Sequence, residues 1–323
     1  MSYDIIGDIH GECGKLIALL GKLGYRERQG AWRHPERTAV FVGDFIDRGP
    51  RQVDTVRTAR AMVEAGSALA VMGNHEFNAI AWHTPDPDRP GDFLRSHFSA
   101  EKGAKNRRQH AAFLAEVEDR PQLHQEIIDW FLTLPLWLDL PGVRVVHACW
   151  HQSFMDFLAP ALLPGNRVSP EFMVAASREP VEHEKDTPEP TTFKAAEAVT
   201  KGVEINLPAG HIFTDKDGVR RHRVRVRWWD AGAVNFRQAA IYGDLDQQEL
   251  PEHPIPEHAR IKYAGDKPVV FGHYWFWLRP AQEPQPLSDK AACVDYSAVK
   301  GGPLVAYRWE GEAALRPSGF VRT

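Results

Sequence analysis

Paired cysteines and long apolar runs are both scarce in this sequence. Its 323 residues include three cysteines, Cys13, Cys149 and Cys293, an odd number spread far apart. That pattern argues against a disulfide framework and favours a reducing compartment. No apolar run approaches the ~20 residues of a membrane-spanning helix, and the N-terminus lacks the basic and apolar regions of a signal peptide. We therefore expect a soluble, cytoplasmic protein.

An excess of positive charge is also absent. The formal net charge is −4 and the pI is about 6.4, so no overall basic field recruits nucleic acid or membrane. Hydrophobic residues make up 43% of the chain and charged residues 25%, enough to bury a core. Neither an internal repeat nor a low-complexity tract is found, and we expect a single domain spanning residues 1–323.

Short apolar runs of strand length recur, and each is followed by a short polar sequence motif, called a polar word below. The runs "YDII", "TAVFV", "ALAVM", "VRVV" and "KPVVF" lead into "GDIHG", "GDFIDRG", "GNHE", "HACW" and "GHYW". Apolar residues at helical spacing lie between several of them, as at Leu16, Leu19, Leu20 and Leu23 before Gly24. Strands alternating with helices indicate an α/β layered fold. In such folds ligands gather beyond the carboxyl ends of strands, so we treat the five words as one site.

Two stretches depart from this pattern. Residues 155–220 are rich in proline and charge, and we interpret them as an inserted cap or excursion within the domain. The run "RRHRVRVRWW" then alternates arginine with apolar residues, which is typical of a half-buried strand with a basic face. Near the C-terminus, "CVDYSAVKGGPLVAYRWEG" reads as two strands joined by a glycine turn, a closing hairpin.

The polar words supply six side chains of metal-binding type, all offering oxygen or nitrogen: Asp8, His10, Asp44, Asn74, His147 and His273. Such a set suits divalent ions of intermediate hardness, such as Mn, Fe or Zn. It is too large for one tetrahedral ion and fits two ions that share a bridging carboxylate. A pair of ions ~3.5–4 Å apart can clamp both oxygens of a phosphoryl displacement.

These words together resemble the calcineurin-like metallophosphoesterases, and most closely their PPP branch, which includes Ser/Thr protein phosphatases and diadenosine-tetraphosphate hydrolases. The resemblance extends from Gly7 to His273. It implies a four-layer α/β/β/α sandwich of two mixed sheets, with metals at the strand ends. It also implies that Asp44 bridges two metal ions, with Asp8 and His10 on the first and Asn74, His147 and His273 on the second.

The resemblance also assigns the chemistry. It implies that a hydroxide bridging the metals is the nucleophile and that His75 protonates the leaving oxygen. Asp47 then orients the His75 imidazole, and Arg48 holds phosphate oxygens. Structural alternatives stay open, since His75 can be a structural histidine behind the metal ligands and Arg48 can simply pair with Asp47.

The sequence departs from the wider family at "GHYW", where Trp275 stands in the place of a second histidine. The first metal is then open and oxygen-rich, which favours Mn over Zn, with Fe or Zn still possible. A second phosphate-binding arginine is expected but not located. The basic strand supplies the candidates, Arg225 and Arg227 with Arg223, although a solvated strand face is the plainer interpretation.

Aromatic residues and the remaining histidines carry weaker signals. Tyr274, Trp275 and Trp277 can stack a nucleobase, but core packing is the better interpretation. His110 has no partner in any recognised word and is treated as ordinary.

We expect a metal-dependent phosphoesterase acting on a phosphorylated small molecule, nucleotide or phosphoprotein. The first hypothesis is a phosphomonoesterase or protein phosphatase. Alternatives are a dinucleoside-polyphosphate hydrolase, a nucleic-acid phosphodiesterase, which the net charge disfavours, and a non-catalytic binding module on the same fold.

Overall fold

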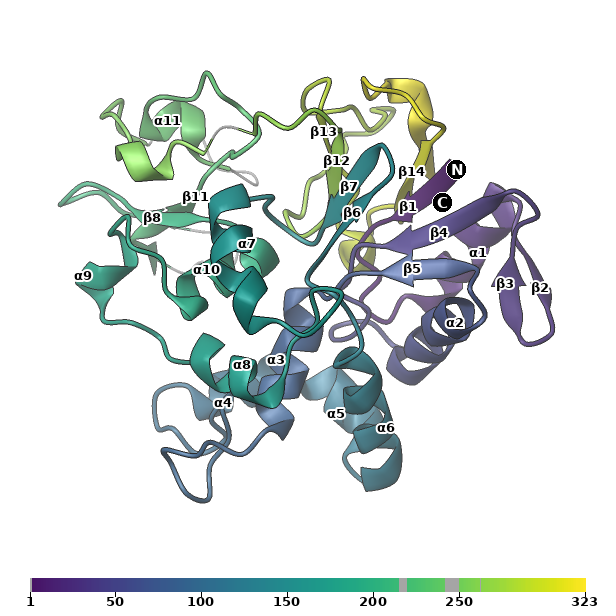
Figure 1. Ribbon diagram of the computed structural model, residues 1–323, viewed down its shortest axis with the longest axis horizontal. Helices are drawn as coiled ribbons and strands as arrows, with labels where there is room; N and C mark the ends of the chain where they lie inside the picture. The colour runs from purple at the N-terminus through teal and green to yellow at the C-terminus, as the bar shows by residue number, and fades with distance from the viewer. Residues whose placement is uncertain (1, 215–219, 242–249, 262) are drawn as a thin grey trace.

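Two mixed β-sheets form the centre of the molecule in the computed structural model, which describes residues 2–214, 220–241, 250–261 and 263–323 (Figure 1). The first sheet has the order β15-β14-β1-β4-β5, built from Phe320–Arg322, Val305–Trp309, Ser2–Ile6, Arg37–Phe41 and Ala68–Ala70. Strands β1, β4 and β5 run parallel, and β14 and β15 are antiparallel additions.

The second sheet has the order β13-β12-β7-β6, built from Ala291–Cys293, Val269–Phe271, Val143–Val146 and Trp137–Leu140. All five strands expected before the polar words are present, three in the first sheet and two in the second. One buried cluster joins Ile5 and Val40 of the first sheet to Val145 and Val270 of the second. The sheets therefore pack face to face.

Helices cover the outer faces. On the first sheet, α1 (Cys13–Leu23) ends at the left-handed Gly24 and α2 (Gln52–Glu64) packs beside it, as the apolar spacing predicts. On the second sheet lie α7 (Gln152–Leu158) and α10 (Thr192–Lys201), where the Ala148 N–H donates to the Val199 carbonyl. The expected α/β/β/α sandwich is confirmed.

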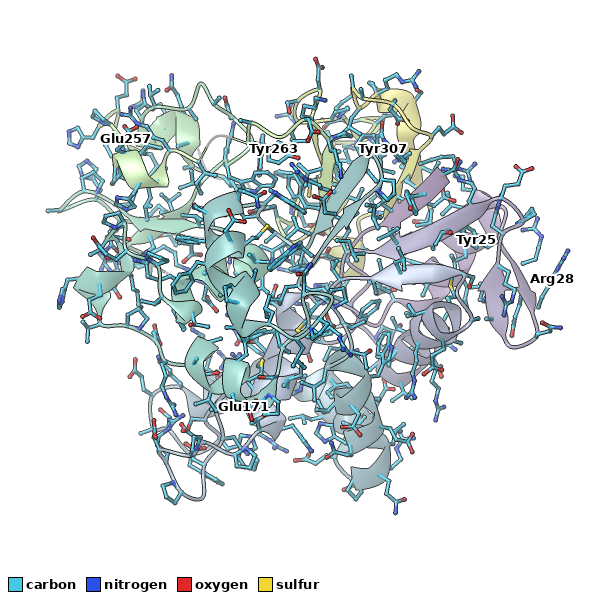
Figure 2. All side chains as sticks on the ribbon, viewed as in Figure 1. Tyr25, Arg28, Glu171, Glu257, Tyr263 and Tyr307 are labelled. Carbon is cyan, nitrogen blue, oxygen red and sulfur yellow. The ribbon has the colours of Figure 1, made fainter. Side chains whose placement is uncertain are left out.

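A helical group closes one end of the sheets, visible below them in Figure 1. It comprises α3 (Asn74–His83), α4 (Gly103–Gln109), α5 (Ala111–Val117) and α6 (Pro121–Phe131). Charged side chains such as Arg28, Glu171 and Glu257 project from the ribbon into solvent (Figure 2). Within the described residues, no helix combines the length and apolar character that crossing a membrane requires. The cytoplasmic location stays a prediction.

The stretch 155–220 is partly helical, apart from residues 215–219, which lie outside the described residues. Besides α10 it contains α8 (Pro170–Ala176), α9 (Glu182–Lys185), β8 (Glu204–Asn206) and β9 (Phe213–Thr214). The chain continues into β10 (Arg220–Arg221), β11 (Arg223–Arg225) and α11 (Phe236–Ala239). A separate small core that includes Ile205, Val224 and Phe236 lies in this part of the chain. The single-domain assignment and the function of this stretch as a cap stay predictions.

The expected closing hairpin is wrong. The strands that flank the Gly301-Gly302 turn are β13 and β14, and they belong to different sheets. Apolar runs and a glycine turn mark where strands begin and end, but they do not identify the strand that each one pairs with. This segment therefore crosses from the second sheet to the first.

Candidate metal and phosphate site

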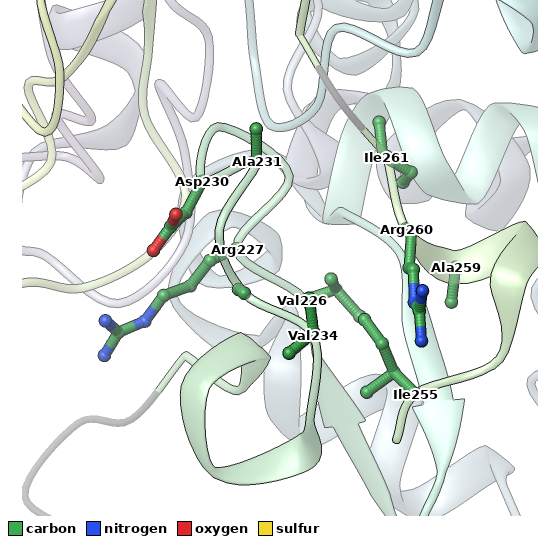
Figure 3. A pocket seen from close by; sticks show the side chains of 10 residues that line it. Val226, Arg227, Asp230, Ala231, Val234, Ile255, Ala259, Arg260 and Ile261 are labelled. Atoms are coloured by element: carbon green, nitrogen blue, oxygen red, sulfur yellow. The ribbon is translucent and has the colours of Figure 1, made fainter.

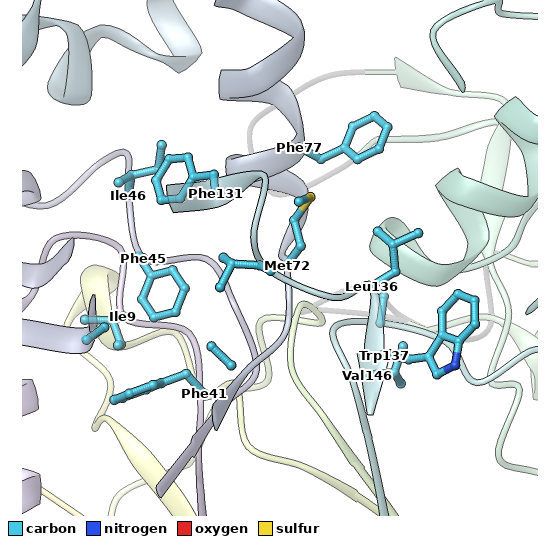
Figure 4. Packing of buried hydrophobic residues seen from close by; sticks show 14 of the residues in the cluster. Ile9, Phe41, Phe45, Ile46, Met72, Phe77, Phe131, Leu136, Trp137 and Val146 are labelled. Atoms are coloured by element: carbon cyan, nitrogen blue, oxygen red, sulfur yellow. The ribbon is translucent and has the colours of Figure 1, made fainter. Parts of the chain in front are cut away.

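Buried apolar side chains anchor the loops that carry the candidate ligands. Ile9 lies between Asp8 and His10, and Phe45 and Ile46 lie between Asp44 and Asp47. All three apolar side chains are fully buried, and Figure 4 shows them beside Phe131 and Met72. These buried apolar side chains therefore fix the loops that carry the candidate ligands.

Asp44 lies at the centre of the arrangement. Its Oδ2 is 3.5 Å from Nε2 of His10 and 3.4 Å from Nε2 of His147. Its Oδ1 accepts a hydrogen bond from the His75 backbone N–H at 3.0 Å. Two ligand clusters meet at this carboxylate, one formed with His10 and His75 and the other with His147 and His273. Asp44 thus belongs to both clusters, which is the position expected of a bridging ligand.

The other expected ligands surround these clusters. Asn74 Oδ1 lies 3.1 Å from Nε2 of His147, whose Nδ1 contacts the Val42 carbonyl oxygen at 2.7 Å. Asp8 belongs to neither cluster, but its Oδ2 accepts a hydrogen bond from the His273 backbone N–H at 3.0 Å. All six expected ligands are at most 8% exposed.

Several ligand atoms lack a hydrogen-bond partner despite complete burial. They are Asp8 Oδ1, His10 Nε2 and both ring nitrogens of His273. A buried polar atom without a partner costs about 1–3 kcal/mol, and such atoms are rare in folded proteins. The donor set and its unpartnered atoms therefore fit divalent cations.

Electrostatics favour the metal-binding form of three expected ligands, whereas burial raises the pKa of Asp8 and the charge of Asp44 outweighs burial to raise the pKa of His147. Burial, followed by the charge of His75, lowers the pKa of His10 to about 3. Burial, followed by the charge of Arg225, lowers the pKa of His273. Burial alone would raise the pKa of Asp44, but His147 and His75 outweigh it and lower that pKa. Neutral imidazoles and an ionised carboxylate are the forms that bind metals.

Backbone strain gathers in these loops. The non-glycine residues with left-handed φ angles include His10, Asp44, Asp47, Arg48, His273 and Trp275. Such conformations cost of order 1–3 kcal/mol each and persist where surrounding structure enforces them. Two glycines allow the close packing: a Cβ on Gly272 would lie 2.0 Å from Asp8 Oδ1, and one on Gly73 would lie 2.3 Å from Asp44 Oδ1.

Gly272→Ala should consequently displace the Asp8 carboxylate. We expect kcat/KM to fall by about 10²-fold, the effect of misplacing a reacting group by ~1 Å. Steady-state kinetics of the purified variant measure the loss of activity, and thermal unfolding measures any loss of stability. Gly21→Ala in α1 is the matched control, because nothing lies within 4 Å of its added Cβ. Equal activity of the two variants would contradict the predicted crowding.

A three-residue array runs inward from the site. Nδ1 of His75 lies 2.5 Å from Asp47 Oδ2, and the other Asp47 oxygen lies 2.8 Å from Nδ1 of His110. Burial would raise the pKa of Asp47, but the two histidines, His110 foremost, lower it. The sequence interpretation missed His110, because it lies in a helical segment with no motif around it.

Glu76 was also missed, although it stands inside the word "GNHE". Its carboxylate is fully buried and accepts backbone N–H bonds from Asp44, Phe45 and Gly73 at 2.8, 2.8 and 3.0 Å. Burial, followed by the charge of Asp44, raises its pKa to about 7. Glu76 therefore ties the loop after β4 to the start of α3 and positions Asp44.

Arg48 lies at the exposed side of the site. Its Nη2 is 3.5 Å from His75 Nε2, and its guanidinium lies over the Trp275 ring at 4.1 Å. Within the described part of the chain, no carboxylate lies at ion-pair distance from Arg48. The suggested pairing of Arg48 with Asp47 is therefore wrong, and the guanidinium is held by cation–π contact instead.

The arginines of the basic strand separate into different environments. Arg223 pairs with Glu182 and Asp186, and Arg225 pairs with Glu204. The charge of Arg225 nevertheless contributes, after burial, to lowering the pKa of His273.

Arg227 lies beyond β11, which ends at Arg225, and its Nε donates to the Ala240 carbonyl. It lines a pocket of the small core, with Arg260 on the opposite side (Figure 3). Among the described residues it has no hydrogen bond or ion pair to a candidate ligand. The second phosphate-binding arginine therefore stays a prediction for both Arg225 and Arg227.

The aromatic residues in and just after "GHYW" also lie in different environments. Tyr274 is buried, and its hydroxyl accepts from the Trp228 indole, so it is a packing residue. Trp275 stacks on the His10 ring, with centroids 5.1 Å apart and planes inclined by 27°. Trp277 is 42% exposed. Trp275 thus packs directly against a candidate metal ligand.

Residues 1–153, just under half of the chain, match the family model of the calcineurin-like phosphoesterases. The match contains five of the six candidate ligands, with His75, Asp47 and Arg48. It ends before His273.

Individual relatives extend the comparison. Bis(5'-nucleosyl)-tetraphosphatase PrpE [asymmetrical] of Halalkalibacterium halodurans is 45% identical over 76 residues, 23% of this chain and 31% of that protein. Symmetrical bis(5'-nucleosyl)-tetraphosphatase of Vibrio cholerae is 24% identical over 96% of both chains. A cold-active protein-tyrosine phosphatase of Shewanella covers 99% of this chain and 80% of its own at 16% identity, with a TM-score of 0.47, too low to support an inference. The chain thus spans less than a third of the length of the relatives with high identity.

Proposed function

We propose that this protein is a metal-dependent phosphohydrolase that cleaves phosphoester or phosphoanhydride bonds with two divalent ions. The observation that carries the proposal is the convergence of buried, unpartnered ligand atoms on Asp44, beside the His75–Asp47 pair. Phosphate-ester hydrolysis is among the slowest uncatalysed reactions, so a site of this electrostatic strength suits it. A non-catalytic binding module has no need of that pair.

The ligands divide around Asp44. Asp8 and His10 would hold one ion with it, and Asn74, His147 and His273 the other. Bound there, the two ions would supply Lewis-acid polarisation of phosphoryl oxygens and a nucleophile at neutral pH. Ligands with oxygen and imidazole donors and no thiolate favour manganese, with iron or zinc as alternatives.

The protein's own residues perform the remaining steps. His75 gives a proton from Nε2 to the leaving oxygen, while Asp47 holds the proton on Nδ1 and orients the ring. Arg48, held against Trp275, presents its planar fork to the phosphoryl oxygens. Arg225 would add a second positive charge from the side of His273.

Two substrate classes fit this site, phosphomonoesters of small molecules or proteins and dinucleoside polyphosphates. The names of both relatives favour the second class. Nucleic acid is disfavoured by the net charge of −4.

A parallel activity screen tests the proposal. Chelator-treated protein is assayed with and without Mn²⁺ on diadenosine tetraphosphate, a phosphopeptide, p-nitrophenyl phosphate and bis-p-nitrophenyl phosphate. We expect metal-dependent turnover of the dinucleotide, of a monoester, or of both. Undetectable turnover of every substrate by protein that binds the metal stoichiometrically would overturn the proposal and favour a binding module.

A further inference from the structure

His110 contacts the oxygen of Asp47 that His75 leaves free. Oδ2 of Asp47 lies 2.5 Å from Nδ1 of His75, and Oδ1 lies 2.8 Å from Nδ1 of His110. Across the described parts of the chain, these two rings are the hydrogen-bond partners of the Asp47 carboxylate. Glu76, by contrast, accepts three backbone N–H bonds. The orientation of the Asp47 carboxylate therefore depends on both histidines.

The surroundings of His110 determine which of its ring nitrogens carries the proton. The residue is 3% exposed, and its Nε2 is buried without a hydrogen-bond partner. An ionised carboxylate only accepts hydrogen bonds, so Nδ1 of His110 donates to Asp47 Oδ1. A second proton on Nε2 would have no acceptor there. His110 is thus a neutral imidazole protonated on Nδ1.

Helix packing fixes the ring of His110 against Asp47. His110 joins α4 to α5, and its backbone N–H donates to the Asn106 carbonyl at 3.2 Å. The imidazole packs against Phe113 and Trp82, with ring centroids 5.0 and 6.0 Å away. Trp82 belongs to α3, the helix that also carries the other partner of Asp47. The donor is therefore in place before any substrate binds.

The Asp47 carboxylate needs a second support of this kind. Its terminal torsion is soft, because rotation about the Cβ–Cγ bond of an aspartate has broad minima. The backbone adds strain, with a left-handed φ of 70° at Asp47. A donor on Oδ1 restricts the rotation and keeps Oδ2 directed at His75.

We propose that His110 is a positioning residue for the general acid, acting through Asp47 without touching the substrate. By holding Oδ1 of Asp47 it fixes the direction of Oδ2, and with it the orientation of the His75 ring. Nε2 of His75 then presents its proton to the leaving oxygen, while His110 keeps its own proton throughout. This inference rests on the proposed phosphohydrolase function.

The first test compares His110→Leu with wild type in excess Mn²⁺. For phenyl phosphate we expect kcat to fall about tenfold with KM nearly unchanged, the effect of losing one hydrogen bond to a charged group. For p-nitrophenyl phosphate we expect a fall of about threefold or less, because this leaving group departs without protonation. His110→Asn should restore most of the loss, since the amide nitrogen of asparagine can take the position of Nδ1.

His124→Leu is the matched control and should behave as wild type. His124 is a buried histidine of the same helical group, also with an unpartnered Nε2, but its ring contacts His83 and Phe113. On the fastest substrate of the activity screen, His110→Leu should cause no further loss in a His75→Asn background. An additive loss there, or equal losses for both aryl phosphates, would overturn the inference and leave His110 a structural function only.

A measurement without substrate separates this inference from the proposed function. Nitrogen-15 NMR of histidine-labelled, Zn²⁺-loaded protein reports which ring nitrogen carries the proton, and loss of signals in His110→Asn assigns those of His110. We expect His110 protonated on Nδ1, and a His75 Nδ1–H signal that moves in His110→Leu but little in His110→Asn. A proton on Nε2 of His110, or an unmoved His75 signal, overturns the assignment even if wild type is an active hydrolase. The expected spectra from protein that hydrolyses no substrate would support the positioning of His75 and reject the enzymatic proposal.

Discussion

Asp44→Asn is expected to remove bound metal and hydrolytic activity together. The carboxylate lies between His10 and His147 and is almost fully buried, so its charge serves both clusters. An amide of the same shape keeps the packing but removes the negative charge that compensates two dications. We expect activity to fall by more than about 10³-fold, with metal content measured by mass spectrometry on the same preparation.

Asp86→Asn is a useful control for this variant. Asp86 is also buried and paired, with Arg89 and Arg178 as its partners. Its substitution tests whether loss of any buried carboxylate removes bound metal, and we expect the Asp86→Asn variant to retain both metal ions. Near wild-type turnover by Asp44→Asn would make the shared-ligand scheme wrong.

His75→Asn is expected to keep both metals and lower kcat by about 10²–10⁴-fold, the usual contribution of a general acid. The ring contacts Asp47 through Nδ1, and its Nε2 faces Arg48 and Asp44. The loss should shrink for p-nitrophenyl phosphate relative to phenyl phosphate, because nitrophenolate leaves without protonation. A series of aryl phosphates of increasing leaving-group pKa measures this dependence.

His83→Asn provides the comparison within the same helix, since His83 contacts Gln125 at the outer end of α3. It should retain wild-type dependence on the leaving group. An identical loss for every aryl phosphate in His75→Asn would assign His75 a structural function instead of proton transfer.

Much of the layered fold was predictable, because each apolar run ends in a polar word and strand ends of parallel sheets meet at one edge. The β1, β4 and β5 strands and the α1 and α2 helices follow directly from this pattern. The pairing of β13 was not predictable, because a short buried strand with no alternation suits either sheet.

The same limit applies to the site: residues in short local motifs were predictable, whereas contacts between segments distant in sequence were not. The six expected ligands converge because each lies in a short word that follows a strand. His110 was not predictable, since its contact with Asp47 spans 63 residues and depends on how α4 and α5 pack. Contacts made by tertiary packing leave no periodic trace in the sequence.

Anomalous scattering from a crystal grown with Mn²⁺ tests the central claim most directly. The predicted result is two peaks ~3.5–4 Å apart, both within coordination distance of Asp44, one next to His10 and Asp8 and the other next to His147 and His273. A single peak, peaks remote from Asp44, or no bound metal would contradict the two-ion site.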